Sequence, residues 1–366
     1  MTTDHRTDRP RIAFYAPMKP PDHPNPSGDR HIARLTLEAL ARAGFDAKTV
    51  ARLRSLDMTG DPAAQATLRA EARAETARLI GEMATDPPAL WFTYHCYYKA
   101  PDLLGPTVAE ALGIPYVISE ASISPSRRSG PWAGFAGLSK AAITRADRLF
   151  WTTARDRPAL EAAGNGAKMV HLAAFIDPGP NPGPNPGSRQ SGDPLKLLTV
   201  AMMRPGDKLE SFRRLAAALV HLPGDWRLTV VGHGTARKAA LDILAPFADR
   251  LIHIDDIDDP SLIRPHYEAA DLLVWPGVNE GVGMVWLEAQ AAGLPVIAED
   301  GLAARAVIGG GMLTPPDDPR AFAEAIVDAA ANRLALGRTA RAHVEAHHSL
   351  DAAAETLKSS LLELLK

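Results

Sequence analysis

Short apolar runs alternate with stretches of helical pattern along most of the chain. In the N-terminal half the apolar runs lie at 11–17, 90–94 and 116–119. A helix is predicted at 30–43, between the first run and the second. In the C-terminal half the same alternation gives five runs, at 196–202, 227–231, 250–254, 272–275 and 295–298. Strands that alternate with helices are typical of parallel, doubly wound sheets. The pattern therefore predicts an α/β protein with two Rossmann-like domains.

A segment rich in proline and glycine separates the two series of runs. Residues 178–194 read PGPNPGPNPGSRQSGDP, and ten of these seventeen residues are Pro or Gly. Proline lacks an amide donor and glycine loses the most backbone entropy on ordering, so this segment disfavours a helix or a central strand. We predict an interdomain linker here, between an N-terminal domain at 1–177 and a C-terminal domain at 195–349. A last helix, at 350–366, can pack back on the first domain.

Composition narrows the class of protein. A chain of 366 residues is long enough for two domains, each with its own core, and 46% hydrophobic with 23% charged residues is ordinary for a globular protein. The net charge of −3 does not provide the broad positive field on which non-specific nucleic-acid binding depends. We therefore expect no nucleic-acid partner.

The cysteine content and the length of the apolar runs indicate in which cellular compartment the protein is expected. The single cysteine, Cys96, allows no internal disulfide and no thiolate zinc cluster. The polar N-terminus lacks the apolar core of a signal peptide, and no apolar run reaches the ~18 residues of a membrane span. We expect a cytoplasmic protein whose membrane contact, if any, is weak and peripheral.

The segment after the run 272–275 carries the strongest candidate chemistry. In open parallel sheets, ligands bind beyond the carboxyl ends of the strands. Here Gly281 and Gly283 permit close backbone approach, and a helix is predicted at 284–292. The free amides at its start, 281–284, form an anion site suited to a phosphate. Glu280 in the loop and Glu288 in the helix can reach opposite ends of one ligand; the alternative is a cap and a solvated helix face.

The wider segment resembles a known family. Residues 270–298, ADLLVWPGVNEGVGMVWLEAQAAGLPVIA, resemble the donor-site signature of retaining glycosyltransferases with the GT-B fold, especially family 4 (glycosyl transferases group 1). The core of that signature is two glutamates separated by seven residues, here Glu280 and Glu288. The resemblance implies two Rossmann-like domains that face a central cleft, with the acceptor on the first and the donor on the second. It also implies transfer of a sugar from a nucleoside diphosphate sugar to a hydroxyl acceptor, with retention, without a metal and with no cofactor besides the donor.

The resemblance also implies roles for individual residues. Arg204 and Lys208 are expected at the diphosphate, where two fixed cations stabilise the charge of the leaving group. Glu280 is expected at the donor sugar, Glu288 at the ribose, and His95 at the sugar from the other domain. The catalytic set is thus predicted as Glu280, His95, Arg204 and Lys208, and the donor-binding set as Gly28, Arg204, Lys208, Glu280, Gly281, Val282, Gly283, Met284 and Glu288.

The roles of several other residues and segments are not settled by the resemblance. His233 stands in a Gly-His-Gly sequence where family members often have Asp, and Glu120 follows the run 116–119 at the same edge as His95. The acidic run 253–259 could suggest a metal site, but we interpret it as a solvated loop. Residues 127–150 are interpreted as an ordinary amphipathic helix, with an interfacial helix on anionic lipid as the alternative.

Two rival functions are less well supported by the sequence. A sugar-nucleotide epimerase or dehydrogenase would place G-x-G-x-x-G after the first strand, where 17–26 is rich in proline instead. A non-catalytic two-lobed sugar-binding protein would normally be exported, and no export signal is present in this sequence. The nucleotide base, the sugar, the acceptor and the oligomeric state are not indicated.

Overall fold

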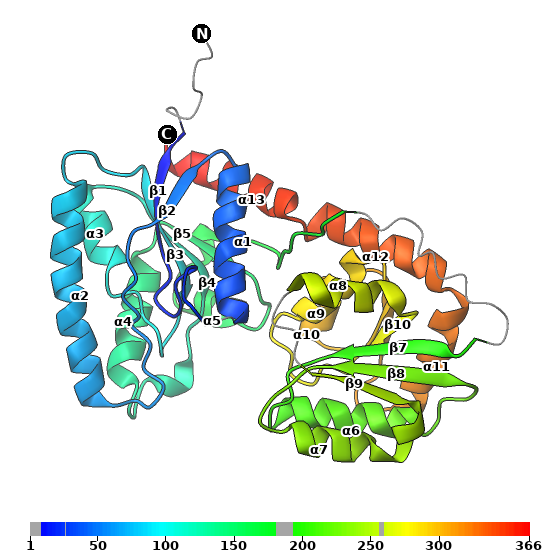
Figure 1. Cartoon of the computed structure of the whole chain (residues 1–366). Coiled ribbons are helices and arrows are strands. Elements are labelled where there is room, and N and C mark those ends of the chain that lie inside the picture. Colours follow the sequence, from blue (N-terminus) through cyan, green and yellow to red (C-terminus); the bar gives the residue numbers. More distant parts are fainter. Residues whose placement is uncertain (1–8, 26, 181–192, 256–259) are drawn as a thin grey trace, which may run out of the picture. The chain divides into compact units, whose positions relative to one another are not determined.

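The computed structural model describes residues 9–25, 27–180, 193–255 and 260–366. The chain divides into two units, one made of Met1–Ala173 with Leu350–Lys366, the other of Ala174–Ser349 (Figure 1). Most of the predicted linker, residues 181–192, lies outside the described residues, as does 256–259 of the acidic run.

The first unit is built on a parallel sheet. Its strands are β1 (Arg11–Tyr15), β2 (Asp46–Thr49), β3 (Leu90–Cys96), β4 (Tyr116–Ala121), β5 (Arg148–Trp151) and β6 (Met169–His171). They lie in the order β2-β1-β3-β4-β5-β6, and every neighbouring pair is parallel. The strand order therefore reverses between β1 and β3, and such a switch point is where an open α/β sheet binds ligands.

Helices cover both faces of this sheet. They are α1 (Gly28–Arg42), α2 (Pro62–Met83), α3 (Gly105–Leu112), α4 (Ala133–Arg145), α5 (Arg157–Ala162) and α13 (Leu350–Leu364), with short 3-10 helices at Pro125–Arg127 and Gly166–Lys168. Helix α1 begins two residues before the predicted start because the Ser27 hydroxyl accepts the Arg30 amide at 3.2 Å. Helix α13 packs against α1, and Arg42 pairs with Asp351 at 2.9 Å (Figure 1).

The second unit has a second parallel sheet. Its strands are β7 (Leu195–Val200), β8 (Trp226–Val231), β9 (Leu251–Ile254), β10 (Leu272–Val274), β11 (Val296–Glu299) and β12 (Gly311–Thr314), in the order β12-β11-β10-β7-β8-β9. The helices are α6 (Asp207–Leu219), α7 (Arg237–Leu244), α8 (Pro260–Ala269), α9 (Met284–Ala291), α10 (Leu302–Val307), α11 (Pro319–Ala331) and α12 (Arg333–His347), and Ala245–Arg250 forms a 3-10 helix. Here the order reverses between β7 and β10. The predicted α/β class with two Rossmann-like sheets is confirmed.

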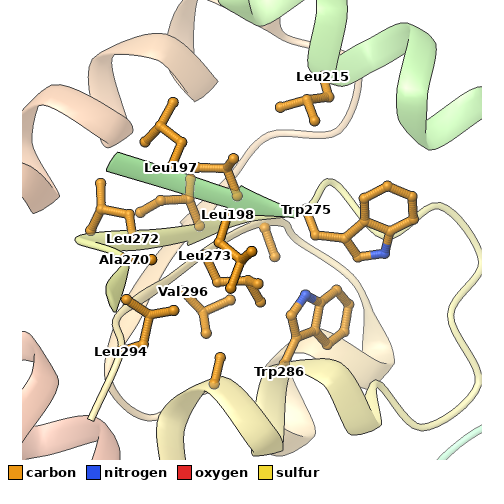
Figure 2. Close-up of a cluster of buried hydrophobic side chains, with 14 of the residues drawn as sticks. Leu197, Leu198, Leu215, Ala270, Leu272, Leu273, Trp275, Trp286, Leu294 and Val296 are labelled. Atoms are coloured by element: carbon orange, nitrogen blue, oxygen red, sulfur yellow. The ribbon is translucent and has the colours of Figure 1, made fainter. Parts of the chain in front are cut away.

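The core of the second unit lies between its central strands and helices that include α6, α9 and α11. Leucine and valine side chains of β7, β10 and β11 fill it, and Trp275 and Trp286 lie together at one end of the cluster (Figure 2). Both indoles are almost completely buried. Burial of side chains of this size stabilises the fold by roughly 1.5–3 kcal/mol each, so this end of the sheet is well anchored.

Some elements differ from those predicted. The segment 127–150 is not one amphipathic helix: α4 spans Ala133–Arg145, and Arg148–Trp151 forms β5. Strands β3 and β4 extend further than their apolar runs, so His95 and Glu120 lie within the strands rather than after them. Both residues have a left-handed backbone, with φ of +61° and +53°. Such a conformation in a non-glycine residue is strained by about 1–3 kcal/mol and is most often found at functional sites.

Candidate active site

The clearest polar arrangement of the second unit lies at the switch point between β7 and β10. Lys208 stands in the first turn of α6, after β7, and Glu280 stands in the loop that follows β10. The Lys208 ammonium donates to Glu280 Oε1, and the Trp275 indole N–H donates to the same oxygen at 2.9 Å. The Glu280 side chain is only 13% exposed. Its carboxylate is therefore fixed by two donors at the edge where a ligand is expected.

Trp275 connects this pair to the core. The indole packs edge-on against Phe212 with a ring-centroid distance of 5.2 Å. Lys208 Nζ lies 5.5 Å from the centroid of the Trp275 ring, within cation–π range. The cation and the carboxylate are thus both positioned by one buried aromatic side chain.

The start of α9 presents backbone amides beside this pair. Gly283 is the N-cap, with φ of +76°, and a Cβ there would lie 2.2 Å from the Trp286 ring. A Cβ on Gly281, by contrast, would meet nothing within 4 Å. Within the described ranges, no hydrogen bond occupies the amides of residues 281–283. Amides of this kind at a helix N-terminus are suited to an oxyanion. The anion site expected at 281–284, which includes Val282 and Met284, stays a prediction.

Glu288 lies one turn into α9 and is held by a neighbouring helix. The Tyr267 hydroxyl of α8 donates to Glu288 Oε2 at 2.7 Å. Burial raises the pKa of Glu288, and the hydrogen bond from Tyr267 opposes part of this effect. A partly buried carboxylate with a fixed donor is better suited to binding a hydroxyl than a solvated one.

The structure does not bring Arg204 to the Lys208 and Glu280 pair. Arg204 lies in the loop after β7, its side chain is exposed, and its amide donates to Met202 O at 3.2 Å. Among the residues that the structure describes, its guanidinium forms no ion pair. Its role at a diphosphate stays a prediction.

The Gly-His-Gly sequence has a packing role. A Cβ on Gly232 would lie 2.0 Å from Ala201 O, and one on Gly234 would lie 2.2 Å from Met203 O. The loop after β8 therefore lies directly on the loop after β7, and His233 O accepts the Met203 amide at 2.8 Å. The exposed His233 ring lies 3.8 Å from Asp255. This position thus supports the loop after β7 through its backbone.

In the first unit, His95 belongs to a polar cluster at the carboxyl ends of β3 and β4. His95 Nδ1 lies 3.1 Å from Asp29 Oδ1, in the first turn of α1, so the pair spans the switch point between β1 and β3. Glu120 accepts a hydrogen bond from the Tyr94 hydroxyl at 3.4 Å. Gly28, beside Asp29, has open space around its Cβ position. The strained backbone of His95 and Glu120 therefore accompanies a real cluster of charges.

Electrostatics couple the members of this cluster. Burial lowers the pKa of His95, but the hydrogen bond to Asp29 and the nearby carboxylates outweigh it, so the pKa is raised. Burial also acts to raise the pKa of Asp29, but His95 prevails and lowers it. Burial raises the pKa of Glu120, since the charge of His95 opposes it only in part. The pattern favours an imidazolium at His95 paired with an ionised Asp29.

Sequence reasoning missed three partners in these sites. Trp275 enters the sequence analysis only as the end of the apolar run 272–275, and no sequence pattern singles out Tyr267 or Asp29 as partners in a site. The available signal was weak: Trp275 stands five residues before Glu280, directly after the strand. Pairings between elements distant in sequence depend on strand order, which apolar runs do not give.

The described residues provide neither a metal cluster nor a membrane-spanning helix. Among the described residues there is no group of three or more His, Cys, Asp or Glu side chains suited to a metal ion. Of the acidic run, Asp255 pairs with Arg237 at 2.9 Å, and residues 256–259 lie outside the described part. No helix in the described part of the chain has both the length and the apolar character to cross a membrane.

Each of the two units is doubly wound, and the second has a lysine, a carboxylate and free backbone amides at its switch point. Residues 194–332 match the family model described as glycosyl transferases group 1. A D-inositol 3-phosphate glycosyltransferase 1 of Catenulispora acidiphila is 30% identical over 327 residues, which cover 73% of this chain and 72% of that protein. The chain belongs to the group 1 glycosyl transferases and is a glycosyltransferase.

Solved structures agree on the fold. Sucrose-phosphate synthase from Thermosynechococcus elongatus superposes with a TM-score of 0.71 at 20% identity, over 97% of this chain and 99% of that one. HepE of Anabaena in complex with UDP gives a TM-score of 0.71 at 14% identity, over 96% and 100%. The predicted GT-B fold and the predicted glycosyltransferase class are confirmed.

Proposed function

We propose that this glycosyltransferase takes its sugar from a nucleoside diphosphate sugar bound at the switch point between β7 and β10. The observation that carries the proposal is the pairing of Lys208 with Glu280 beside the free amides at the start of α9. The Lys208 ammonium has three donors, and its hydrogen bond to Glu280 Oε1 uses one of them. The remaining donors and the amides suit the oxygens of a diphosphate.

The roles of the two carboxylates differ in this proposal. Glu280 holds the transferred sugar, near the carbon where positive charge develops, and Glu288 accepts hydrogen bonds from the ribose. Arg204, exposed in the loop after β7, moves onto the diphosphate with Lys208. A uridine nucleotide is the first candidate, since HepE is described in complex with UDP.

The reaction proposed is transfer with retention and without a metal. The bond between the anomeric carbon and the β-phosphate oxygen breaks, and the acceptor oxygen forms its bond to that carbon on the same face. The acceptor proton goes to the β-phosphate oxygen, so no carboxylate forms a covalent intermediate. Lys208, Arg204 and the amides stabilise the negative charge that the leaving diphosphate gains.

The test is a screen of nucleotide sugars with candidate acceptors, read by mass spectrometry, with the anomeric configuration of the product determined by NMR. D-inositol 3-phosphate belongs in the acceptor panel because the Catenulispora relative is named for it. We expect an α-linked product from an α-linked donor, in the presence of EDTA as well as in its absence. An inverted product, or a strict need for manganese or magnesium, would overturn the mechanism.

A further inference from the structure

The chain enters the second unit through residues 174–180, here called the crossover segment. The carbonyl of His348, directly after α12, accepts the Ile176 amide at 2.9 Å. The carbonyl oxygens of residues 178–180 all accept hydrogen bonds from arginine side chains. Hydrogen bonds from a charged donor are roughly twice as strong as neutral ones, so this end of the segment is held firmly. The function proposed above gives these contacts no role.

Two arginines on different helices hold these carbonyls. Arg264 of α8 donates to the carbonyl oxygens of Pro178, at 3.2 Å, and Pro180. Arg341 of α12 donates to the carbonyl oxygens of Pro178, at 2.7 Å, and Gly179, at 2.8 Å. Pro178 O therefore accepts from both helices, which uses both of its lone pairs. The crossover segment thus connects α8 to α12.

Arg341 also holds the end of α9, the helix that carries Glu288. It donates to Ala291 O, at the last residue of α9, and the last four carbonyls of a helix lack partners within it. A cation at a helix C-terminus also interacts favourably with the helix dipole. A Cβ on Gly337 of α12 would lie 2.3 Å from Gly293 O, so α12 packs directly on the turn that ends α9. Arg341 is only 7% exposed, so its acceptors and this packing fix its position.

Arg264 is connected to the same carboxylate through α8. Tyr267 stands three residues after Arg264, so the two side chains are neighbours on the helix surface. Tyr267 is only 2% exposed, and its hydroxyl donates to Glu288 Oε2 at 2.7 Å. The contacts therefore close a ring that begins and ends at Pro178 O. One half of the ring runs through α8 and Tyr267 to Glu288, and the other half returns through α9 and Arg341.

We propose that Arg264 and Arg341 are positioning residues of the nucleotide site, which together with the crossover segment fix the Glu288 carboxylate for the ribose. This inference rests on the proposed function, which places Glu288 at the ribose. Neither arginine touches the nucleotide; each acts through the helix that carries Glu288 or its hydrogen-bond donor. A hydrogen bond weakens steeply with misalignment, so a small shift of α8 or α9 weakens the contact with the ribose. By linkage, a nucleotide bound at Glu288 stabilises the contacts of the crossover segment in return.

Gly179 offers a variant that disturbs the ring without a change in any of the three helices. Its backbone is left-handed, with φ of +60°, and Asp177 Oδ1 accepts its amide at 3.0 Å. A Cβ there would lie 2.2 Å from Arg264 Nη1, the end of a flexible side chain, so Gly179→Ala should displace the guanidinium. Gly224→Ala is the matched control in the same unit, since Gly224 has φ of +80° and its Cβ would meet no described atom within 4 Å.

The first measurement is hydrogen exchange of the full chain without nucleotide, read by mass spectrometry. Gly179→Ala should raise exchange in peptides that span 263–270 and 286–293, because α8 and the end of α9 lose part of their support. Gly224→Ala should leave exchange in these peptides as it is in the wild type. Unchanged exchange in Gly179→Ala, or an equal rise in Gly224→Ala, would overturn the ring, with no dependence on whether a nucleotide binds.

The second measurement separates the ribose from the diphosphate. Calorimetry compares UDP with inorganic pyrophosphate, which has no ribose. Arg264→Lys and Arg341→Lys keep the charge but lose the planar set of donors, and each should weaken UDP by at least about threefold while pyrophosphate changes by less than about twofold. Gly179→Ala should show the same difference, which keeps the proposal testable if Arg341→Lys does not fold. Gly224→Ala should change neither affinity. Equal losses for both ligands, or unchanged UDP affinity, would contradict the positioning role.

A double-mutant cycle with Tyr267→Phe tests how the effect reaches the carboxylate. Tyr267→Phe removes the hydrogen bond that α8 provides to Glu288, so Gly179→Ala should weaken UDP less in that background than in the wild type. Fully additive losses of UDP affinity would overturn the proposal. Failure of the proposed function gives a different result: UDP and pyrophosphate would then both fail to bind the wild type, and the exchange measurement alone would decide whether the ring holds α8 and α9.

Discussion

Glu280 is the residue on which the donor site depends most, because one buried indole and one ammonium hold the same oxygen of its carboxylate. Removal of the ammonium takes the charged donor away from a carboxylate that is only 13% exposed. Arg204 is exposed, and its guanidinium holds no buried carboxylate among the described residues. The resemblance assigns both Lys208 and Arg204 to one diphosphate. Loss of the Lys208 side chain should lower the stability of the fold more than loss of the Arg204 side chain.

We expect Lys208→Ala to lower both nucleoside diphosphate affinity and stability, the latter by about 1–3 kcal/mol, since a buried acceptor loses its charged partner. Arg204→Ala should change stability by less than about 0.5 kcal/mol while still weakening the nucleotide. Urea unfolding and calorimetry with UDP measure the two effects. Nucleotide affinity that is unaltered in Arg204→Ala removes this residue from the site.

The paired glutamates should differ in kinetics. Glu280→Gln keeps an amide oxygen for the Trp275 N–H but loses the charge near the reacting carbon, so turnover should fall most. Glu288→Gln weakens a charge-assisted hydrogen bond to a ribose hydroxyl that changes little in the reaction, so the donor KM should rise most, by about tenfold or more. Steady-state kinetics of folded variants decide this. Intact turnover in both variants at saturating donor would mean that the pair only binds.

The raised pKa of His95 should depend on Asp29. Because the pKa is raised, the imidazolium stabilises the native state below the ordinary value of about 6.5, and this stabilisation is lost as the pH rises through the folded pKa. Asp29→Asn should lower the pKa of His95 in an NMR titration. The charge of Asp156 also raises the pKa of His95, but less than Asp29 does, so Asp156→Asn should lower it less. An unchanged pKa in Asp29→Asn would show that the pair is not electrostatically coupled.

Among the elements, α9 begins at Gly283, where a side chain would be strained. Gly281, two residues earlier, does not have this restriction. Gly283 has φ of +76° and faces the Trp286 ring at 2.2 Å from its Cβ position, whereas Gly281 has open space. Gly283→Ala should therefore destabilise the protein by at least about 1 kcal/mol in urea unfolding, because both the backbone and the indole must shift.

Gly281→Ala is the matched variant for that element. Its stability should stay near that of the wild type, but a methyl group in the open space beside the free amides should weaken UDP binding. Equal stability losses in the two alanine variants would contradict this account of how α9 begins.

The sequence predicted the central elements better than the edges. Strands such as β10 are buried on both faces and give continuous apolar runs, so their positions were evident. Strands β2, β6 and β12 lie at the edges of the sheets, and their sequences do not form continuous apolar runs. Strand β5 is short and follows a segment rich in basic residues. The motif points to the loop with Glu280 as the candidate donor site, whereas its partner Trp275 and the Tyr267 partner of Glu288 depend on strand order and helix packing that no local pattern contains.

On the scale of the whole molecule, the chain returns to its first unit at the end. Leu357 of α13 is fully buried, whereas Leu362, one turn further on, is 41% exposed. Leu357→Ala should cost about 2–5 kcal/mol and raise hydrogen exchange in α1, against which α13 packs. Leu362→Ala should have little effect. Equal effects of the two variants, or unchanged exchange in α1, would contradict the packing of α13.

The central claim is that the second unit holds a nucleoside diphosphate at the switch point between β7 and β10. Hydrogen exchange read by mass spectrometry, with UDP, GDP, ADP and dTDP in turn, tests it most directly. We predict that at least one nucleotide slows exchange in peptides that span 202–209 and 277–288, and that Lys208→Ala abolishes this protection. Protection confined to the first unit, or no protection by any of the four nucleotides, would contradict it.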